Sequence, residues 1–192
     1  MSERIQNVQP KQWNGRNYRS TLEAETAQTL DALGIPFRYE ERKIVLQEGF
    51  RCPYQKEKVR DLTYCPDFEI GPIMLECKGF ETPEWKIKKK LLFKWLMENE
   101  PDTIFYQIHD SKKSLLQILD RHLTYLNCCL EVTSKGSNRH PSEVKRYESI
   151  SEALEDLNLK GKATGPILRS LTGQKQWVYG YSWKLIKLNT LL

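Results

Sequence analysis

Two acidic residues and one lysine are spaced in a way that suits phosphodiester chemistry. Asp67 follows Pro66, and Glu76 stands two residues before Lys78. Side chains alternate between the two faces of a strand, so Glu76 and Lys78 share one face if residues 73–78 are extended. Two carboxylates can hold a hard divalent cation. A lysine beside them can orient or deprotonate the attacking water.

The stretch that carries these residues is expected to form a hairpin. Residues 63–79 read as two short strands joined by a turn at Gly71-Pro72. In the second strand, one face would enter a core with Ile73, Leu75 and Cys77, and the other would carry Met74, Glu76 and Lys78. An ordinary hairpin with solvated charges would contain the same pairs of residues, so these motifs alone leave both interpretations open.

A third acidic candidate, Glu23, lies in an expected helix near the N-terminus. Residues 1–17 are polar and basic and are interpreted as a flexible arm. Ser20 then opens a helix with Glu23 three residues later, which is the capping-box pattern, and Gly34 is placed to end it. Glu23 is therefore either the capping glutamate or a metal ligand that the first helix supplies.

Several further elements must position these residues. We expect a strand over 37–46, a charged hairpin over 47–60, a helix over 82–99, a strand over 103–108 and a helix over 114–127. The helix that starts after Thr82 should bury an apolar stripe of Ile87, Leu91, Leu92, Trp95 and Leu96. Its lysines form either a solvated face or a phosphate-binding surface, for which the candidates are Lys86, Lys89 and Lys90.

The order of these motifs resembles the PD-(D/E)XK nuclease superfamily. More narrowly, four segments together are similar to the endonuclease I family of T-odd phages, which are Holliday-junction resolvases. These segments are Tyr18-Arg19-Ser20-x-Leu22-Glu23, Leu33-Gly34-Ile35-x-Phe37-x-Tyr39-Glu40-Glu41, Tyr64-x-Pro66-Asp67-Phe68 and Glu76-x-Lys78-Gly79. The likeness extends over roughly residues 16–110.

The resemblance implies an α/β fold of the restriction-endonuclease type, with a mixed-sheet core flanked by helices. It implies four catalytic residues, which are Glu23, Asp67, Glu76 and Lys78. The three acids would bind Mg²⁺, for which Mn²⁺ is expected to substitute. In the family, the region that corresponds to the segment between Tyr39 and Tyr64 links the swapped halves of a dimer, and that segment is longer here.

The C-terminal part reads as a small DNA-binding module. Two short helices, one ending near Leu157 and one over 164–171, could form a helix-turn-helix or could simply pack on the nuclease domain. Residues 147–153 and 180–184 resemble the NUMOD helix-turn-helix modules of homing endonucleases, over about residues 144–187. That resemblance implies DNA-facing candidates at Lys162, Thr164, Arg169, Ser170 and Lys175.

Length and charge agree with two domains. The chain has 192 residues and a net charge of +5. We expect an arm over 1–17, a nuclease domain over 18–133, a linker over 134–141 and the DNA-binding module over 142–192. Residues 134–192 carry 10 Lys and Arg but only 5 Asp and Glu, so they hold the whole positive excess. A basic segment of this kind is compatible with a polyanionic partner.

The remaining composition favours a reduced, non-membrane environment. The five cysteines include no Cys-x-x-Cys pair, which argues against a zinc site or a disulfide framework. No apolar run is long enough to cross a bilayer, and the N-terminus lacks the apolar core of a signal peptide. We therefore expect an intracellular protein, in the cytoplasm of a bacterial host if a phage encodes it.

These inferences lead to a Mg²⁺-dependent DNA endonuclease of homing type. It would cut double-stranded DNA at a site recognised partly by the C-terminal module, leaving 5′-phosphate and 3′-hydroxyl ends. The first alternative is a Holliday-junction resolvase that selects branched DNA by its shape. The second is a catalytically silent DNA-binding protein. Cutting both strands needs two active sites, so we expect a homodimer, whose halves could be swapped as in the phage enzymes.

Overall fold

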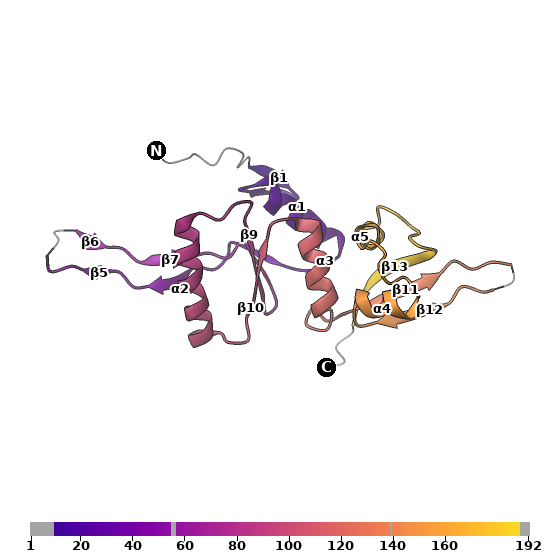
Figure 1. The fold of residues 1–192 in the computed structure, drawn as a ribbon. Coiled ribbons are helices and arrows are strands. Elements are labelled where there is room, and N and C mark those ends of the chain that lie inside the picture. The colour runs from indigo at the N-terminus through magenta and orange to yellow at the C-terminus, as the bar shows by residue number, and fades with distance from the viewer. Residues whose placement is uncertain (1–9, 55–56, 139, 189–192) are drawn as a thin grey trace. The chain divides into compact units, whose positions relative to one another are not determined.

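The structure is a computed structural model that describes residues 10–54, 57–138 and 140–188 (Figure 1). Within these residues it is a mixed α/β fold with five helices and several small sheets. Contacts between Cα atoms divide the chain into two compact units, one formed by Phe37–His109 and the other by Met1–Pro36 together with Asp110–Leu192. Among the described residues, no helix has the length and apolarity needed to cross a membrane.

The unit of residues 37–109 is built on a four-stranded mixed sheet in the order β10-β9-β8-β3. Its strands are β3 (Arg38–Tyr39), β8 (Phe68–Ile70), β9 (Ile73–Cys77) and β10 (Ile104–Ile108). The hairpin predicted over residues 63–79 is confirmed, because β8 and β9 pair antiparallel across Gly71-Pro72. Gly71 has φ +55°, a conformation that glycine adopts at little cost.

Strand β9 is buried on both faces, including the face for which the sequence predicts Met74 and Glu76. Met74 is 1% exposed and Glu76 is 3% exposed. The reason is the helix α2 (Pro83–Asn99), which covers this face. Met74 belongs to one buried cluster with Trp85, Leu92 and Leu96 of α2.

Helix α2 starts where the sequence predicts, and most of the predicted stripe packs inward, with Trp85 added and Ile87 as the exception. Thr82 is its N-cap and its side chain accepts a hydrogen bond from the Trp85 amide at 3.2 Å. The buried residues are Trp85, Leu92 and Leu96. The expected member Ile87 is 63% exposed. Two residues turn a helix by about 200°, so Ile87 points away once Trp85 packs inward.

The strand predicted over residues 37–46 is broken into β3 and β4 (Ile44–Gln47). The break follows Tyr39, because Glu40 has φ +49° and its amide donates to the Asp67 carbonyl at 3.2 Å. Strand β4 then pairs with β7 (Leu62–Tyr64). Beyond this pair, β5 (Phe50–Arg51) and β6 (Lys58–Val59) form the hairpin that was predicted for residues 47–60.

The second unit begins with a hairpin that sequence reasoning missed. Residues 10–17 belong to the predicted flexible arm, yet β1 (Lys11–Trp13) pairs antiparallel with β2 (Arg16–Tyr18). The Trp13 indole donates to Asp31 Oδ2 at 2.7 Å, which attaches the hairpin to α1 (Thr21–Ala32). The rest of the predicted arm, residues 1–9, lies outside the described residues.

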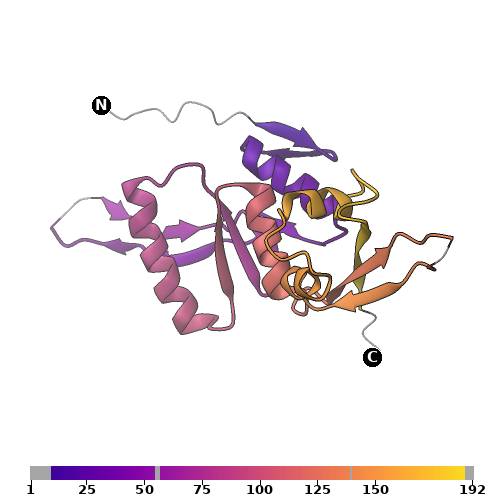
Figure 2. The same cartoon turned by 45° about the vertical axis from the view of Figure 1, so that its right-hand side comes forward.

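The C-terminal part of this unit is a three-stranded antiparallel sheet with two short helices, which the turned view of Figure 2 brings forward. The sheet has the order β12 (Val144–Tyr147), β11 (Cys128–Ser134) and β13 (Tyr181–Lys187). The helices are α4 (Ile150–Asp156) and α5 (Gly165–Leu171), as predicted. Helix α4 contacts β12 and α3 (Ser111–His122), and α5 contacts β13 and α3.

The structure divides the chain differently from the predicted boundary at residues 134–141. Strand β11 precedes that linker but pairs with β12 and β13, which follow it. Trp183 of β13 is 1% exposed, so the C-terminal helices and β11 share one core. The composition of residues 134–141 signals a hairpin connection between β11 and β12 rather than a link between domains.

Candidate active site

Asp67 directly precedes β8, and Glu76 lies near the end of the neighbouring strand β9. The register pairs Phe68 with Leu75, and Asp67 and Glu76 are the neighbours of these two residues along the chain. Asp67 is 9% exposed, and its Oδ2 accepts a hydrogen bond from the Cys77 amide at 2.7 Å. This bond to the neighbouring strand fixes the carboxylate beside β9, so the sequence-predicted pair of acids is brought together.

Glu76 is a buried carboxylate with two different partners. Its Oε2 accepts a hydrogen bond from the Tyr64 hydroxyl at 2.6 Å. Its Oε1 lies 2.8 Å from Lys78 Nζ. A buried charge is tolerated only when it is paired and hydrogen-bonded, and these two contacts meet that need.

Tyr64 remains a hydrogen-bond donor at this site. Burial raises the pKa of its hydroxyl, and the charge of Glu76 raises it further. The phenol therefore stays protonated under physiological conditions and donates its proton to Glu76. Tyr64 was quoted above only as part of a motif, and no pattern in the sequence shows that it contacts Glu76.

The Lys78 side chain is partly exposed to solvent, although it contacts the buried carboxylate of Glu76. Its side chain is 34% exposed, whereas that of Glu76 is 4% exposed. The ammonium lies 5.0 Å from the centre of the Trp85 ring. A cation at this distance from an indole face is attracted by the ring quadrupole. Lys78 is thus held by an anion on one side and an aromatic ring on another.

Gln107 extends the site onto the next strand. Strands β9 and β10 are parallel, and Gln107 pairs in register with Glu76. Gln107 Oε1 accepts from the Trp85 indole at 3.1 Å and from Lys89 Nζ at 3.1 Å. Sequence reasoning did not single out Gln107, because only the register of a parallel pair places it beside Glu76.

His109 closes the same network. Its Nδ1 lies 2.6 Å from the Lys78 carbonyl oxygen, which can only accept, so Nδ1 carries the proton. Its Nε2 lies 3.2 Å from Gln107 Nε2, which donates to it. Hydrogen bonds thus join Trp85 to Gln107, Gln107 to His109 and His109 to the Lys78 carbonyl, and this chain of bonds fixes the orientation of the Gln107 amide.

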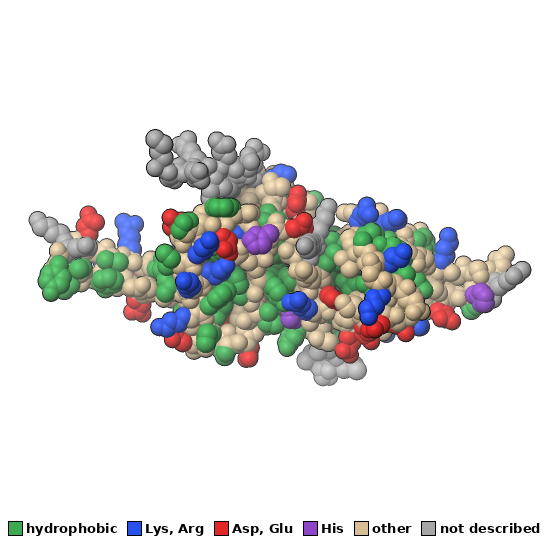
Figure 3. Space-filling model, in the orientation of Figure 1, with side chains coloured by type: hydrophobic (Ala, Val, Ile, Leu, Met, Phe, Trp, Pro, Cys, Tyr) green, Lys and Arg blue, Asp and Glu red, His purple; other side chains and the backbone are tan. Residues whose placement is uncertain are grey.

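The structure distinguishes among the lysines of α2, which gather over this helix in Figure 3. Lys89 bonds to Gln107 and to Glu81, and Lys88 Nζ lies 6.0 Å from the centre of the Tyr64 ring. The other predicted candidates, Lys86 and Lys90, are exposed. Lys88 was not among the candidates, although its ammonium contacts the ring of Tyr64, which donates to Glu76.

Glu23 has the capping-box geometry in the other unit. Its Oε1 accepts from the Ser20 hydroxyl at 2.7 Å, and its Oε2 accepts from the Arg19 amide at 3.0 Å. The Glu23 amide donates to Ser20 Oγ at 3.2 Å in return. The capping interpretation of Glu23 is therefore confirmed, while its role as a metal ligand stays a prediction.

The DNA-facing candidates of the C-terminal part differ in exposure. Lys162, Thr164, Arg169 and Lys175 are exposed, and Lys162 Nζ lies 5.9 Å from the Tyr179 ring. Ser170 is 7% exposed, and its hydroxyl accepts from the Trp183 amide at 3.3 Å. Ser170 therefore joins α5 to β13 and does not face solvent, which corrects its place in the predicted set.

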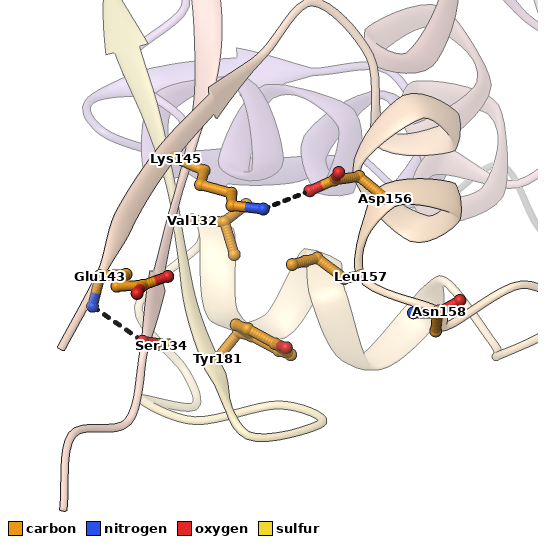
Figure 4. A pocket seen from close by; sticks show the side chains of 8 residues that line it. All are labelled: Val132, Ser134, Glu143, Lys145, Asp156, Leu157, Asn158 and Tyr181. Carbon is orange, nitrogen blue, oxygen red and sulfur yellow. Dashed lines mark hydrogen bonds and ion pairs between the residues drawn. The ribbon is translucent and has the colours of Figure 1, made fainter. Parts of the chain in front are cut away.

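A polar cavity of about 200 Å³ lies elsewhere in this unit (Figure 4). The residues that line it are Val132, Ser134, Glu143, Lys145, Asp156, Leu157, Asn158 and Tyr181. Lys145 and Asp156 are paired at 2.8 Å across one side. None of the predicted catalytic or DNA-facing residues lines it, so it is separate from the site around Glu76.

The donors at Asp67 and Glu76 suit Mg²⁺. No group of three or more His, Cys, Asp or Glu residues arranged for a metal ion is found within the described ranges. Mg²⁺ needs fewer protein ligands, because it commonly takes one or two carboxylates and completes its shell with water and phosphate oxygens. Two adjacent carboxylates beside a partly exposed lysine fit that pattern.

Comparison with known proteins identifies no relative of the chain. No protein-family model matches the chain, and neither a curated protein nor a solved structure matches it. The functional argument therefore rests on the residues and their geometry.

Proposed function

We propose that the chain is a Mg²⁺-dependent DNA endonuclease with an active site of the PD-(D/E)XK type. The observation that carries the proposal is the convergence of Asp67, Glu76 and Lys78 on one hairpin. Asp67 is fixed by the Cys77 amide at 2.7 Å, and Lys78 contacts Glu76 at 2.8 Å. The β8–β9–α2–β10 arrangement that holds them supports the corresponding nuclease core.

Asp67 and Glu76 would hold the metal ion through their carboxylate oxygens. When bound, Mg²⁺ supplies Lewis-acid stabilisation of the charge that develops on the scissile phosphate. Lys78 would orient or deprotonate the attacking water, or stabilise the pentavalent phosphorus. The Lys78 side chain is about one-third exposed, so its ammonium is within reach of a phosphate.

Lysines of α2 would contact the DNA backbone. Lys88 contacts Tyr64 and Lys89 contacts Gln107, while Lys86 and Lys90 of the same helix are exposed. Phosphate contacts of this kind set the position and affinity of the DNA but do not read its sequence. They would place the scissile phosphate near Lys78.

Sequence-directed cutting, as in a homing enzyme, is supported by the exposed basic residues around α5. Lys162, Arg169 and Lys175 are exposed within the segment that holds the positive excess of the chain. A helix with an arginine and basic neighbours can contact both phosphates and base edges. A second copy of the chain would supply the second active site that a double-strand cut requires.

A cleavage assay on three substrates tests the proposal. The full chain is incubated with a random-site linear duplex library, a four-way junction and a single strand, each in Mg²⁺ and in EDTA. Cuts with 5′-phosphate ends in the duplex, only with Mg²⁺, support it. Cutting confined to the junction would favour the resolvase instead, and the absence of any Mg²⁺-dependent cut would contradict both.

A further inference from the structure

We propose that Tyr64 is a positioning residue that selects which oxygen of Glu76 meets the divalent cation. The inference rests on the proposed function, because it concerns the same site. The bond between the Tyr64 hydroxyl and Glu76 Oε2, 2.6 Å long, is its basis. No family motif or charge pattern assigns this task to the tyrosine.

The ring of Tyr64 is fixed on several sides. Tyr64 is 3% exposed and belongs to the buried cluster that includes Ile44, Met74 and Leu92. Its ring centre lies 5.9 Å from that of Trp85. A side chain packed in this way cannot follow a rotating carboxylate, so its hydroxyl defines a fixed point to which Glu76 must conform.

The two oxygens of Glu76 are thereby made unequal. Oε2 is bound by a neutral donor that enters from the core, and Oε1 is bound by the partly exposed ammonium of Lys78. The phenol is fixed in the core and keeps Oε2, whereas the ammonium is partly exposed and can release Oε1 by turning into solvent. Glu76 should therefore bind a divalent cation through Oε1, on the side of Lys78.

Tyr64 also couples the carboxylate to the lysine. Its ring contacts Trp85, whose face holds Lys78 Nζ at 5.0 Å. Removing only the hydroxyl leaves both rings in place but gives Glu76 rotational freedom and one unpaired buried oxygen. Loss of an outer partner of a metal-ligating carboxylate typically weakens metal binding by about 10- to 100-fold.

The test compares Tyr64→Phe with Tyr39→Phe in the full chain. Tyr39 is a matched control, because it is also buried, at 8% exposure, and its ring lies 5.2 Å from that of Phe68 in the same unit. Mn²⁺ affinity is measured by calorimetric titration without DNA, and the unfolding midpoint is measured for each variant. Tyr64→Phe should weaken Mn²⁺ binding by about tenfold or more. Tyr39→Phe should leave Mn²⁺ binding unchanged.

A structural role alone would lower the unfolding midpoint of both variants and leave the Mn²⁺ affinity intact, and that result would overturn the inference. Glu76→Gln checks that the measured ion binds at this site, since it should abolish the Tyr64→Phe effect. If Tyr64→Phe does not fold, the wild-type ring signals of Tyr64 in a Mg²⁺ titration by NMR replace it. They should shift while those of Tyr39 do not, and unmoved Tyr64 signals would count against the proposal.

The outcomes separate this inference from the proposed function. Mn²⁺ binding that depends on Tyr64, in a chain that cuts no DNA, would support the positioning role and contradict the nuclease. DNA cleavage with equal Mn²⁺ affinity in wild type and Tyr64→Phe would support the nuclease and overturn the positioning role. A wild-type chain that binds no Mn²⁺ would overturn both.

Discussion

At the scale of single residues, the site depends on how one buried carboxylate is paired. Glu76 is almost fully buried, yet its two partners differ in charge and in exposure. The neutral Tyr64 hydroxyl orients it, and the cationic Lys78 connects it to the surface. In the proposed nuclease, this division of tasks would allow a buried carboxylate to act on a substrate at the surface.

Lys78→Met tests the chemical role of the ammonium. Methionine keeps an apolar stem beside Trp85 but removes the charge, so DNA affinity should change little. The rate of cleavage should fall by about 10²- to 10⁴-fold, the range for loss of a positioned acid–base group. Lys94→Met is the control, because Lys94 is 72% exposed on the same unit and pairs only loosely with Glu98 at 3.7 Å. Equal single-turnover rates in both variants would contradict the role of Lys78.

Gln107→Leu tests the hydrogen bonds that Gln107 makes beside Lys78. Leucine removes the acceptor of the buried Trp85 indole and of Lys89. An unsatisfied buried donor costs about 1–3 kcal/mol, so the free energy of unfolding in urea should fall by that amount. Gln47→Leu, at an exposed position of β4, should change it by less than about 0.5 kcal/mol. A variant as stable as wild type would show that the network contributes nothing.

At the scale of elements, caps and short turns could be predicted, but long-range contacts could not. Ser20, Thr82 and Ser149 each accept a bond from the amide three residues on, as the local sequence indicates. The Gly71-Pro72 turn likewise follows from local chemistry. The Tyr64–Glu76 bond joins different strands across a core, and nothing local determines it.

The burial of β9 and the exposure of Ile87 show the same limit. A strand with alternating residue types predicts one open face, but that holds only if no helix covers it. Helix α2 covers it here, and Trp85 determines which stripe of the helix packs inward. The periodicity of α2 was compatible with more than one stripe, and tertiary packing chose between them.

Glu23→Gln tests the first helix. Glutamine can accept from the Arg19 amide through its oxygen and donate to Ser20 Oγ through its nitrogen, so the capping box survives. The unfolding free energy should change by about 1 kcal/mol or less. Cleavage should nevertheless fall at least tenfold if Glu23 is an acidic ligand of the site. Activity equal to wild type would leave Glu23 with the capping role alone.

Asp156 at the end of α4 predicts a pH effect. Hydrogen bonds from Lys145 and then Tyr147 lower the pKa of its carboxyl below the ordinary value. A lowered folded-state pKa stabilises the fold above the unfolded value, near pH 3.9, and this contribution is lost as pH falls through the folded pKa. Between pH 5 and about pH 2, the melting midpoint of wild type should fall more than that of Asp156→Asn. Parallel curves would show that the pairing does not stabilise the fold.

At the scale of the whole molecule, the chain starts in one compact unit, forms the second, and returns to the first. The unit of residues 37–109 is inserted between two segments that fold together. Composition suggested a boundary near residue 134, because the segment 134–141 is polar and contains Gly and Pro. The pairing of β11 with β12 and β13 shows why that criterion failed, since the same composition suits a hairpin connection.

Basic residues around α5 are best tested in the full chain, because ending it at residue 133 would leave β11 without either partner strand. Replacing Lys162, Arg169 and Lys175 together by Gln should weaken duplex binding. Each lost phosphate contact lowers the slope of log K against log salt by about 0.9. The triple variant of Lys43, Lys58 and Lys135, which are exposed at other places, is the charge-matched control. Equal slopes in the two variants would exclude α5 as a DNA-binding element.

The proposed active site is tested most directly by single-turnover cleavage of duplex DNA. The variants are Asp67→Asn and Glu76→Gln, alongside Glu98→Gln. The first two exchange a buried carboxylate of the site for an amide of the same shape, and Glu98 is exposed on α2. We expect wild type and Glu98→Gln to cut in Mg²⁺ at similar rates. The two site variants should still bind DNA and remain folded, and should lose cleavage by more than about 10²-fold. Mg²⁺-dependent cutting at the wild-type rate by either site variant would contradict the proposed active site.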